Sequence, residues 1–205
     1  MKILGLLLFL ILTETCLAQF KVTRLDKNAV PKNIQYNGNI VQAVRWIDST
    51  GDNTVILTAT EKTQSKNASG RDAALYAYHY LVSGDSIKQT WKIYDCIKEC
   101  DVDMDLYFVD KAFAVTDLNK DGKAEVWIMY KNSCHGDVSP VAMKIIMYQD
   151  NKKFAVRGTT KVPVSANEYA GGEFTFDDAF KEAPAEFRQY AERLWKQHRV
   201  ETWKQ

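Results

Sequence analysis

The sequence predicts a mainly β protein made of antiparallel meanders in two duplicated halves, followed by a C-terminal α-helix. Three observations support this fold class. Segments of alternating apolar and polar residues recur along the chain, aromatic residues make up 12% of it with only 4 prolines, and helical spacing of apolar residues appears near the C-terminus. Alternation is typical of half-buried strands, which aromatic and β-branched residues favour. We therefore expect one β-rich domain over residues 19–205.

Residues 1–18 are expected to form a secretory signal peptide. Lys2 supplies the positive start, an apolar run extends over residues 3–12, and Cys16 and Ala18 place small residues before Gln19. The run is shorter than the roughly 20 residues that span a bilayer. We expect cleavage before Gln19, no transmembrane segment in the mature chain, and a periplasmic or extracellular location.

Cleavage would remove Lys2 and Glu14, one basic and one acidic residue, so the formal net charge stays at +1. This balance implies no polyanionic partner, and we expect no binding to nucleic acid.

Three cysteines remain after cleavage: Cys96, Cys100 and Cys134. In one strand, Cys96 and Cys100 would lie about 13 Å apart, beyond the roughly 7 Å that a disulfide allows between Cα atoms. We expect a Cys100–Cys134 disulfide with Cys96 free, unless residues 96–100 form a helical turn.

The strongest local pattern is TDLNKDGKAEVWIMY, residues 116–130, which predicts a calcium loop. Oxygen-bearing side chains stand at alternate positions, Gly122 allows a sharp bend, and an acidic residue follows at the ninth position. The expected Ca²⁺ ligands are Asp117, Asn119, Asp121, Glu125 and the backbone carbonyl of Lys123. The alternative is a solvated turn in which Asn, Asp and Gly serve only the backbone geometry.

An EF-hand is not expected, because its twelfth loop position needs Glu and here is Ile128. An apolar segment, residues 112–115, precedes the loop instead. This arrangement resembles the calcium loops of FG-GAP and VCBS repeats, the integrin-type β-propeller blades. Glu125 stands where Asp is the commoner residue. The resemblance implies propeller-blade-like meanders with a calcium ion at their turn.

A second segment resembles this loop. Residues 44–57 (VRWIDSTGDNTVIL) carry the same kinds of residue as residues 115–128 (VTDLNKDGKAEVWI), and an offset of 69 positions (117 − 48) places Asp48 on Asp117 and Asp52 on Asp121. Each is followed by a hairpin-like pair of segments. We expect pseudo-repeats over residues of about 40–95 and 110–162. The alternative is two meanders that share a pattern without a common origin.

The first copy is expected to have lost its metal. Thr50 replaces Asn119, and Ile56 stands where the second copy has Glu125.

Residues 131–140, KNSCHGDVSP, and the strand-like segment after them follow the calcium loop. Together with the loop, they resemble a family of small exported bacterial proteins named for surface polysaccharide biosynthesis. The resemblance covers residues 113–162, about a quarter of the chain. It implies involvement in that pathway and no defined reaction.

Asp101, Asp103 and Asp105 alternate, so a single strand would project all three carboxylates from one face. They are interpreted as a second metal site, as paired carboxylates of a glycosidase, or as a charged sheet edge that resists pairing. Cys134 and His135 are adjacent and would point to opposite faces of a strand, so we assign no catalytic residue. Asp137 is expected to lie near the calcium loop or to cap the next turn.

A helix is expected over residues of about 184–202, with Pro184 at its first position and its apolar side on a sheet face or edge. Tyr76, Tyr78 and Tyr80 would share one strand face. That stripe is interpreted as a stacking platform for a glycan or as packing beneath the helix.

These features predict an exported calcium-binding envelope protein that acts as a binding or accessory factor, with an envelope glycan or protein as partner. The alternatives are a glycan-active hydrolase that uses Asp103 and Asp105, and an inhibitor of an envelope hydrolase.

Overall fold

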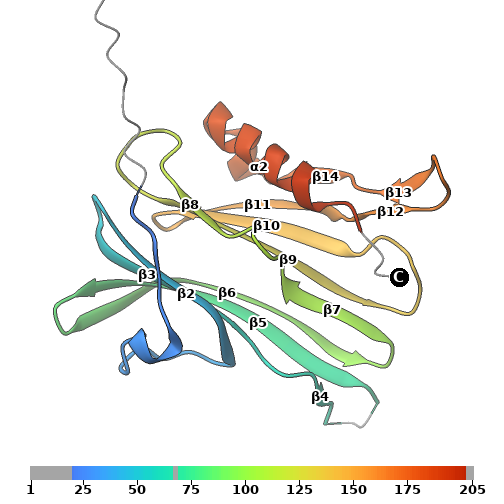
Figure 1. The fold of residues 1–205 in the computed structure, drawn as a ribbon, viewed down its shortest axis with the longest axis horizontal. Helices are drawn as coiled ribbons and strands as arrows, with labels where there is room; N and C mark the ends of the chain where they lie inside the picture. The colour runs from blue at the N-terminus through green and yellow to red at the C-terminus, as the bar shows by residue number, and fades with distance from the viewer. Residues whose placement is uncertain (1–19, 67–68, 202–205) are drawn as a thin grey trace, which may run out of the picture.

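Two antiparallel sheets pack face to face in the computed structural model of the protein (Figure 1). The structure describes residues 20–66 and 69–201, so the expected signal peptide lies outside the described residues. The prediction of a mainly β chain with a C-terminal helix is confirmed. No helix in the described ranges is long and apolar enough to cross a membrane.

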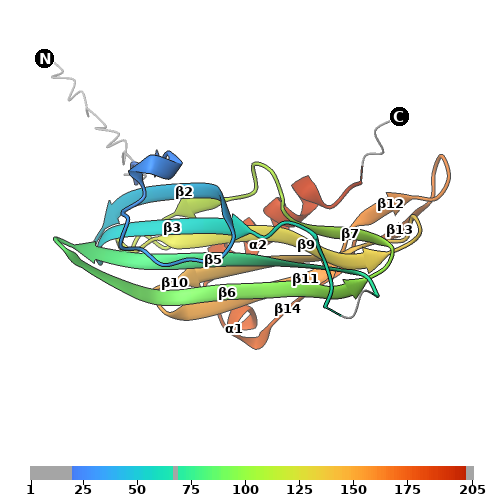
Figure 2. The ribbon, with the colours of Figure 1, turned by 90° about the horizontal axis from the view of Figure 1, so that it is seen from below.

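The first sheet has the strand order β1-β2-β3-β5-β4, with β6 paired to β5 (Figure 2). Long strands form its central meander, β2-β3-β5-β6, in which tight turns join β2 to β3 and β5 to β6, and a longer connection that includes β4 joins β3 to β5. The strands are β1 (Thr23–Arg24), β2 (Asn39–Asp48), β3 (Gly51–Ala59), β4 (Thr63–Gln64), β5 (Arg71–Ser83) and β6 (Ser86–Cys100).

The second sheet has the order β14-β11-β10-β9-β7, with β8 paired to β9. Its strands are β7 (Asp103–Phe108), β8 (Ala114–Thr116), β9 (Glu125–His135), β10 (Ala142–Gln149), β11 (Lys152–Thr159) and β14 (Phe174–Phe176). A separate hairpin pairs β12 (Lys161–Pro163) with β13 (Tyr169–Gly171). The helices are η1 (Lys27–Ala29), α1 (Asp178–Lys181) and α2 (Ala185–His198).

The residues of the two predicted pseudo-repeats form two meanders, β2-β3-β5-β6 and β8-β9-β10-β11. In each meander the four strands pair with one another in the order in which they follow along the chain. They form opposite layers of a sandwich. Neither sheet closes into a barrel within the described ranges, and nothing in this arrangement confirms a propeller.

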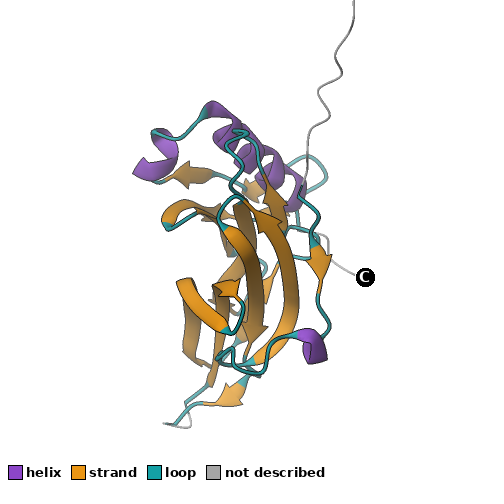
Figure 3. Ribbon diagram, turned by 90° about the vertical axis from the view of Figure 1, so that its left-hand side faces the viewer, coloured by secondary structure: helices purple, strands orange, loops and turns teal. Residues whose placement is uncertain are grey.

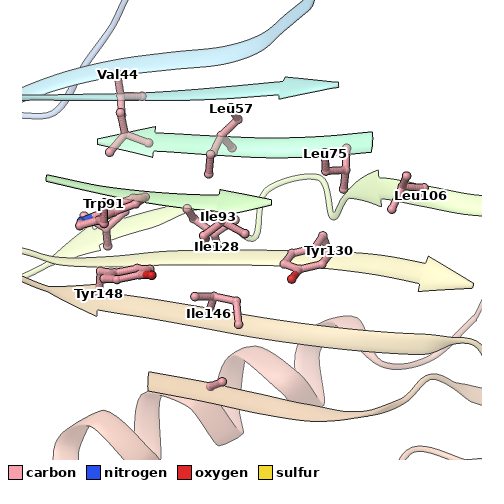
Figure 4. Close-up of a cluster of buried hydrophobic side chains, with 14 of the residues drawn as sticks. Val44, Leu57, Leu75, Trp91, Ile93, Leu106, Ile128, Tyr130, Ile146 and Tyr148 are labelled. Carbon is pink, nitrogen blue, oxygen red and sulfur yellow. The ribbon is translucent and has the colours of Figure 1, made fainter. Parts of the chain in front are cut away.

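The main core lies between the sheets (Figure 4). Side chains alternate along β9, so that Val126, Ile128 and Tyr130 point into this core while Trp127 and Met129 point to the opposite face. Both faces of β9 are thus buried, which accounts for its continuous apolar run. Core residues labelled in Figure 4 are Val44, Leu57, Leu75, Trp91, Ile93, Leu106, Ile128, Tyr130, Ile146 and Tyr148.

Helix α2 covers the outer face of the second sheet (Figure 3). Phe187, Ala191, Leu194 and Trp195 recur at helical spacing and are buried there. The helix ends at His198, earlier than the predicted residue 202. The reason is that the backbone around Lys161 bonds with Arg199 and Glu201, which draws the chain into extended pairing.

The tyrosine stripe packs beneath the N-terminal segment, so the interpretation that placed it under the C-terminal helix is wrong. Val30 and Ile34 cover Tyr78 and Tyr80 on the outer face of the first sheet. The Tyr80 hydroxyl donates to the carbonyl of Gln35 at 2.6 Å.

Covalent and polar links join the two sheets. The predicted Cys100–Cys134 disulfide connects β6 to β9 with a Cα–Cα distance of 5.8 Å, and Cys96 is free. Asp95 of β6 also accepts hydrogen bonds from Tyr130 at 3.1 Å and Lys144 at 2.5 Å, both of the second sheet.

Candidate metal site

The loop between β8 and β9 contains the predicted calcium ligands. Its ends are held by strand pairing of Thr116 with Glu125. Lys120 and Gly122 adopt left-handed backbone conformations, with φ of 58° and 78°. Gly122 therefore makes the sharp bend that the sequence predicts, at a conformation that glycine adopts without steric cost.

The carboxylate of Asp117 gives the main structural evidence for a metal ion in this loop. Its Oδ2 accepts a hydrogen bond from the Gly122 amide at 3.2 Å. Its Oδ1 is buried and has no hydrogen-bond partner within the described residues. An unpaired buried carboxylate oxygen is costly, and buried charges are normally paired or bound to a metal. Asp117 thus fits a cation ligand better than a residue that only shapes the turn.

Glu125 is fully buried at the start of β9. Burial raises the pKa of its carboxyl to about 7, despite hydrogen bonds that favour the charged form. Its Oε2 accepts from the Thr116 hydroxyl at 2.7 Å and the Leu118 amide at 2.9 Å. Asp117 and Asp121 add to the rise because their negative charges lie nearby. Three carboxylates therefore share the loop, and a divalent cation would offset their repulsion.

The other predicted ligands bond mainly to one another. Asp121 Oδ2 accepts from Asn119 Nδ2 at 2.9 Å, and Asp121 Oδ1 accepts from the Lys123 amide at 2.8 Å. The Lys123 ammonium pairs with Asp150 at 2.7 Å on the surface. The structure thus places all five predicted residues in one loop.

Sequence reasoning missed Gln149, which lies at the end of β10. Its Nε2 lies 2.9 Å from Asp121 Oδ2, 3.4 Å from Glu125 Oε1 and 3.5 Å from Asn119 Oδ1. Its position beside the loop follows from the strand register, because Gln149 pairs with Glu125 across the β9–β10 hairpin. A correct prediction of that register would have identified Gln149.

Across the described ranges, no three or more His, Cys, Asp or Glu side chains converge as a metal-binding cluster. Calcium also takes amide and backbone carbonyl oxygens. The predicted ligand set includes one side-chain amide oxygen, from Asn119, and one backbone carbonyl oxygen, from Lys123.

The matching turn of the first half, between β2 and β3, is satisfied by protein donors alone. Asp48 Oδ1 accepts from the Thr50 amide, the Thr50 hydroxyl and Asn53 Nδ2, at 2.6 to 3.0 Å. Its Oδ2 accepts from Trp46 Nε1 at 3.0 Å and the Ala124 amide at 3.1 Å. Burial acts to raise the pKa of Asp48, but these bonds outweigh it and leave the pKa below its ordinary value.

The two turns touch each other across the sandwich. The Ala124 amide that reaches Asp48 belongs to the candidate metal loop. The Ser49 amide also donates to the Gly122 carbonyl at 2.9 Å. These two bonds link the sheets through their turns, so the shape of the loop affects how the layers meet.

A cavity of about 330 Å³ adjoins these turns. His79 lies in its wall between Trp46 and Trp91, with ring centroids 5.6 and 5.1 Å away. Its Nε2 lies 2.9 Å from Asn53 Oδ1, and its Nδ1 lies 2.5 Å from the Thr90 hydroxyl. Burial lowers the pKa of His79 to about 4, although the negative charges of Asp48 and Asp150 oppose this shift. His79 is therefore neutral near pH 7.

The alternating aspartates do not form one strand. Strand β7 begins at Asp103, so Asp101 lies outside it. Strand β7 is an edge strand of its sheet, as the charged-edge interpretation predicts. Asp105 accepts from His135 Nε2 at 3.1 Å, and Asp103 pairs with His135 in register.

Asp137 caps the turn after β9. Its carboxylate accepts from the Ser139 amide and hydroxyl, each at 3.0 Å. This position confirms the turn-capping alternative. His135 Nδ1 donates to the backbone carbonyl of Asp137 in the same turn, at 2.8 Å.

Comparison of the chain with protein-family models, with curated proteins and with solved structures gave no match. The functional argument therefore depends on the residues and their geometry.

Proposed function

We propose that the protein is an exported, calcium-stabilised binding or accessory factor of the bacterial envelope. The loop of residues 117–125 holds the ion through Asp117, Asn119, Asp121, Glu125 and the Lys123 carbonyl. The single observation that carries the proposal is the buried, unpaired Oδ1 of Asp117. The resemblance of the loop to FG-GAP and VCBS repeats supports calcium, and the resemblance of residues 113–162 to the surface polysaccharide family supports the envelope.

The ion has a structural role in this proposal. The loop contacts the opposite sheet through Gly122 and Ala124. A cation that holds Asp117 and Asp121 in place also holds these two backbone groups. Calcium would thus stabilise one end of the sandwich, while the Cys100–Cys134 disulfide joins β6 to β9.

The test is thermal unfolding of the oxidised mature protein in chelator and in increasing calcium. Calcium at one hundred times its dissociation constant should add about 2.7 kcal/mol to the free energy of unfolding. Extracellular modules often bind calcium with dissociation constants of about 10⁻⁴ to 10⁻³ M, so the titration must extend well above millimolar. Adding chelator should return the melting temperature to its value without calcium.

Magnesium is the control ion, because it prefers strict octahedral geometry and retains its water. A melting temperature that calcium does not change, or that magnesium raises equally, would contradict the proposed calcium site.

Two other functions remain as alternatives with their own tests. A glycan-active hydrolase would need the carboxylates of Asp103 and Asp105. An Asp103→Asn variant with unchanged turnover on envelope polysaccharides would rule out this hydrolase. An inhibitor would retain an envelope hydrolase in stoichiometric amount on a column of the immobilised protein. The contact of Asp105 with His135 on an edge strand gives no specific support to catalysis.

A further inference from the structure

A groove of about 1160 Å³ lies between the N-terminal segment and the outer face of the first sheet. Its walls come from η1 and residues 30–37 on one side and from β5 and β6 on the other. Figure 3 shows η1 on the side of the molecule opposite to α1 and α2. This volume exceeds what one small metabolite needs and suits an extended ligand of several units.

The lining of the groove carries positive charge without a compensating acid. Lys27, Lys32 and Lys92 line it, and none of the described Asp or Glu residues does. None of these three lysines forms an ion pair with another described residue. The formal net charge of the chain is only +1, so this local cluster is not visible in the overall balance. An anionic ligand would find a favourable potential here.

Aromatic rings accompany the charges. The Lys92 ammonium lies 5.0, 5.4 and 5.9 Å from the ring centroids of Tyr76, Tyr78 and Tyr94. Tyr94 is 54% exposed, and Tyr36, which lines the groove, is 39% exposed. Exposed tyrosine rings offer flat apolar faces with a polar tip, which suit ligands that are partly apolar and partly wet.

Amide side chains complete the lining. Asn28, Gln35, Asn37 and Gln89 all border the groove. Each amide can both donate and accept hydrogen bonds, as a ligand with many hydroxyl groups requires. The three kinds of side chain therefore match carboxylates, sugar ring faces and hydroxyls respectively.

We propose that this groove binds an acidic oligosaccharide, a chain of hexose units that carry carboxylate groups. The inference rests on the proposed role as an envelope binding factor and names the class of glycan. Lys27, Lys32 and Lys92 bind the carboxylates, Tyr36 stacks on a sugar ring, and the amides bond with hydroxyls. The site lies on the outer face of the first sheet, whereas the candidate metal loop belongs to the second.

The experiment is calorimetric titration of the mature protein with tetragalacturonic acid at low ionic strength, in calcium. Maltotetraose is the matched neutral probe, because it has the same number of α-1,4-linked hexose units and no carboxylates. We expect the acidic tetramer to bind at least about tenfold more tightly, and its affinity to fall as salt screens the lysines.

Substitutions locate the binding. Lys92→Gln, and separately the double variant Lys27→Gln with Lys32→Gln, should each weaken the acidic tetramer by about fivefold, the size expected for exposed charge pairs. Tyr36→Ala should weaken it by a similar factor of about five through lost stacking. The matched control is Lys152→Gln, since Lys152 also lies over an aromatic ring, 5.1 Å from the centroid of Phe154, but on the second sheet.

Equal affinity for the neutral and acidic tetramers would overturn the proposal, as would an equal loss in the Lys152→Gln variant. Competition by inorganic phosphate that Tyr36→Ala does not change would show a simple anion site and would also overturn it. Tighter binding to vesicles of anionic lipid through the same lysines would assign the groove to a membrane surface. The calcium site is judged separately, because unfolding in chelator tests the metal loop and this titration tests the groove.

Discussion

The turn after β2 and the loop after β8 occupy matching places in the two meanders, but their leading carboxylates are satisfied in different ways. Asp48 accepts five hydrogen bonds from protein donors. Asp117 accepts one, and its second oxygen is buried without a partner among the described residues. Protein N–H and O–H groups fill the space around Asp48. Asp117 instead shares its loop with the carboxylates of Asp121 and Glu125, and the negative charges of Asp117 and Asp121 help to raise the pKa of Glu125.

A turn of this kind can therefore be stabilised either by protein hydrogen-bond donors or by a metal ion. Thr50 supplies a donor in the first turn at the position where the second loop has Asn119, and Asn53 supplies another donor to the same carboxylate. Donors satisfy a carboxylate without a cation, whereas acidic and amide oxygens satisfy it only if a cation lies between them. The two turns also touch, so a change in either one affects the same junction between the sheets.

The largest expected effect is that of Asp48→Ala, which leaves several buried donors without an acceptor. We expect a loss of about 3 kcal/mol in the free energy of unfolding, because each unsatisfied buried donor is costly. The loss should be the same in calcium and in chelator, as measured by denaturant unfolding. A loss seen only in calcium would show that Asp48 serves the metal loop and would undo the comparison.

Asp117→Asn should remove the calcium response. At a calcium concentration one hundred times the wild-type dissociation constant, the variant should lack the stabilisation of about 2.7 kcal/mol. In chelator it should be no less stable than the wild type, because the substitution removes an unpaired carboxylate oxygen. A calcium-dependent rise in melting temperature equal to that of the wild type would show that the ion binds elsewhere.

His79, in the wall of the cavity beside the two turns, should make the free energy of unfolding depend on pH. The folded-state pKa of His79 is lowered from 6.5 to about 4, so between these values the unfolded chain binds the proton and the folded chain does not. The contribution of His79 to the free energy of unfolding therefore decreases as the pH falls through this window, by about 2 kcal/mol between pH 7 and 4.5. Asp48 and Asp150 act against the shift, and Lys88 also lines the cavity.

A His79→Gln variant should lose this component of the pH dependence in denaturant unfolding at several pH values. His135→Gln is the control, because the pKa of His135 is raised and its contribution has the opposite sign. An unchanged pH profile in His79→Gln would contradict the assignment.

The smallest effect is expected for Asp52→Asn. Asp52 aligns with Asp121 in sequence, but it pairs with Arg45 on the surface, with Nε to Oδ1 at 2.7 Å. Exposed pairs contribute well under about 1 kcal/mol. The calcium response should be unchanged, whereas Asp121→Asn should reduce it. An equal loss of calcium response in both variants would show that the two turns still share one function.

The sequence predicted much of the local structure. Alternating residues predicted the long strands of both meanders, and periodic apolar residues from Phe187 onward predicted α2. Gly122 predicted the bend of the candidate metal loop. The Cys100–Cys134 disulfide followed from distances within one strand, because a strand has a fixed rise per residue. These features depend on residues close together in the chain.

Other features depend on long-range packing. The tyrosine stripe lies under residues 30–37 rather than under α2, because strand alternation shows that one face is apolar but not which segment covers it. Gln149 reaches the metal loop only through the β9–β10 register. The basic groove brings Lys27 and Lys32 next to Lys92, although the overall charge predicted no polyanionic partner.

Residue spacing along the chain was enough to predict the strands, the C-terminal helix, the disulfide and the residues of the candidate calcium loop, since spacing sets which side chains share a face or a turn. The folded arrangement was needed to see that the two meanders face each other and that their turns meet through Ser49, Asp48 and Ala124. It also decided that the lysines gather in one groove. Such contacts arise from the burial of apolar faces, which is non-directional and does not appear in local sequence.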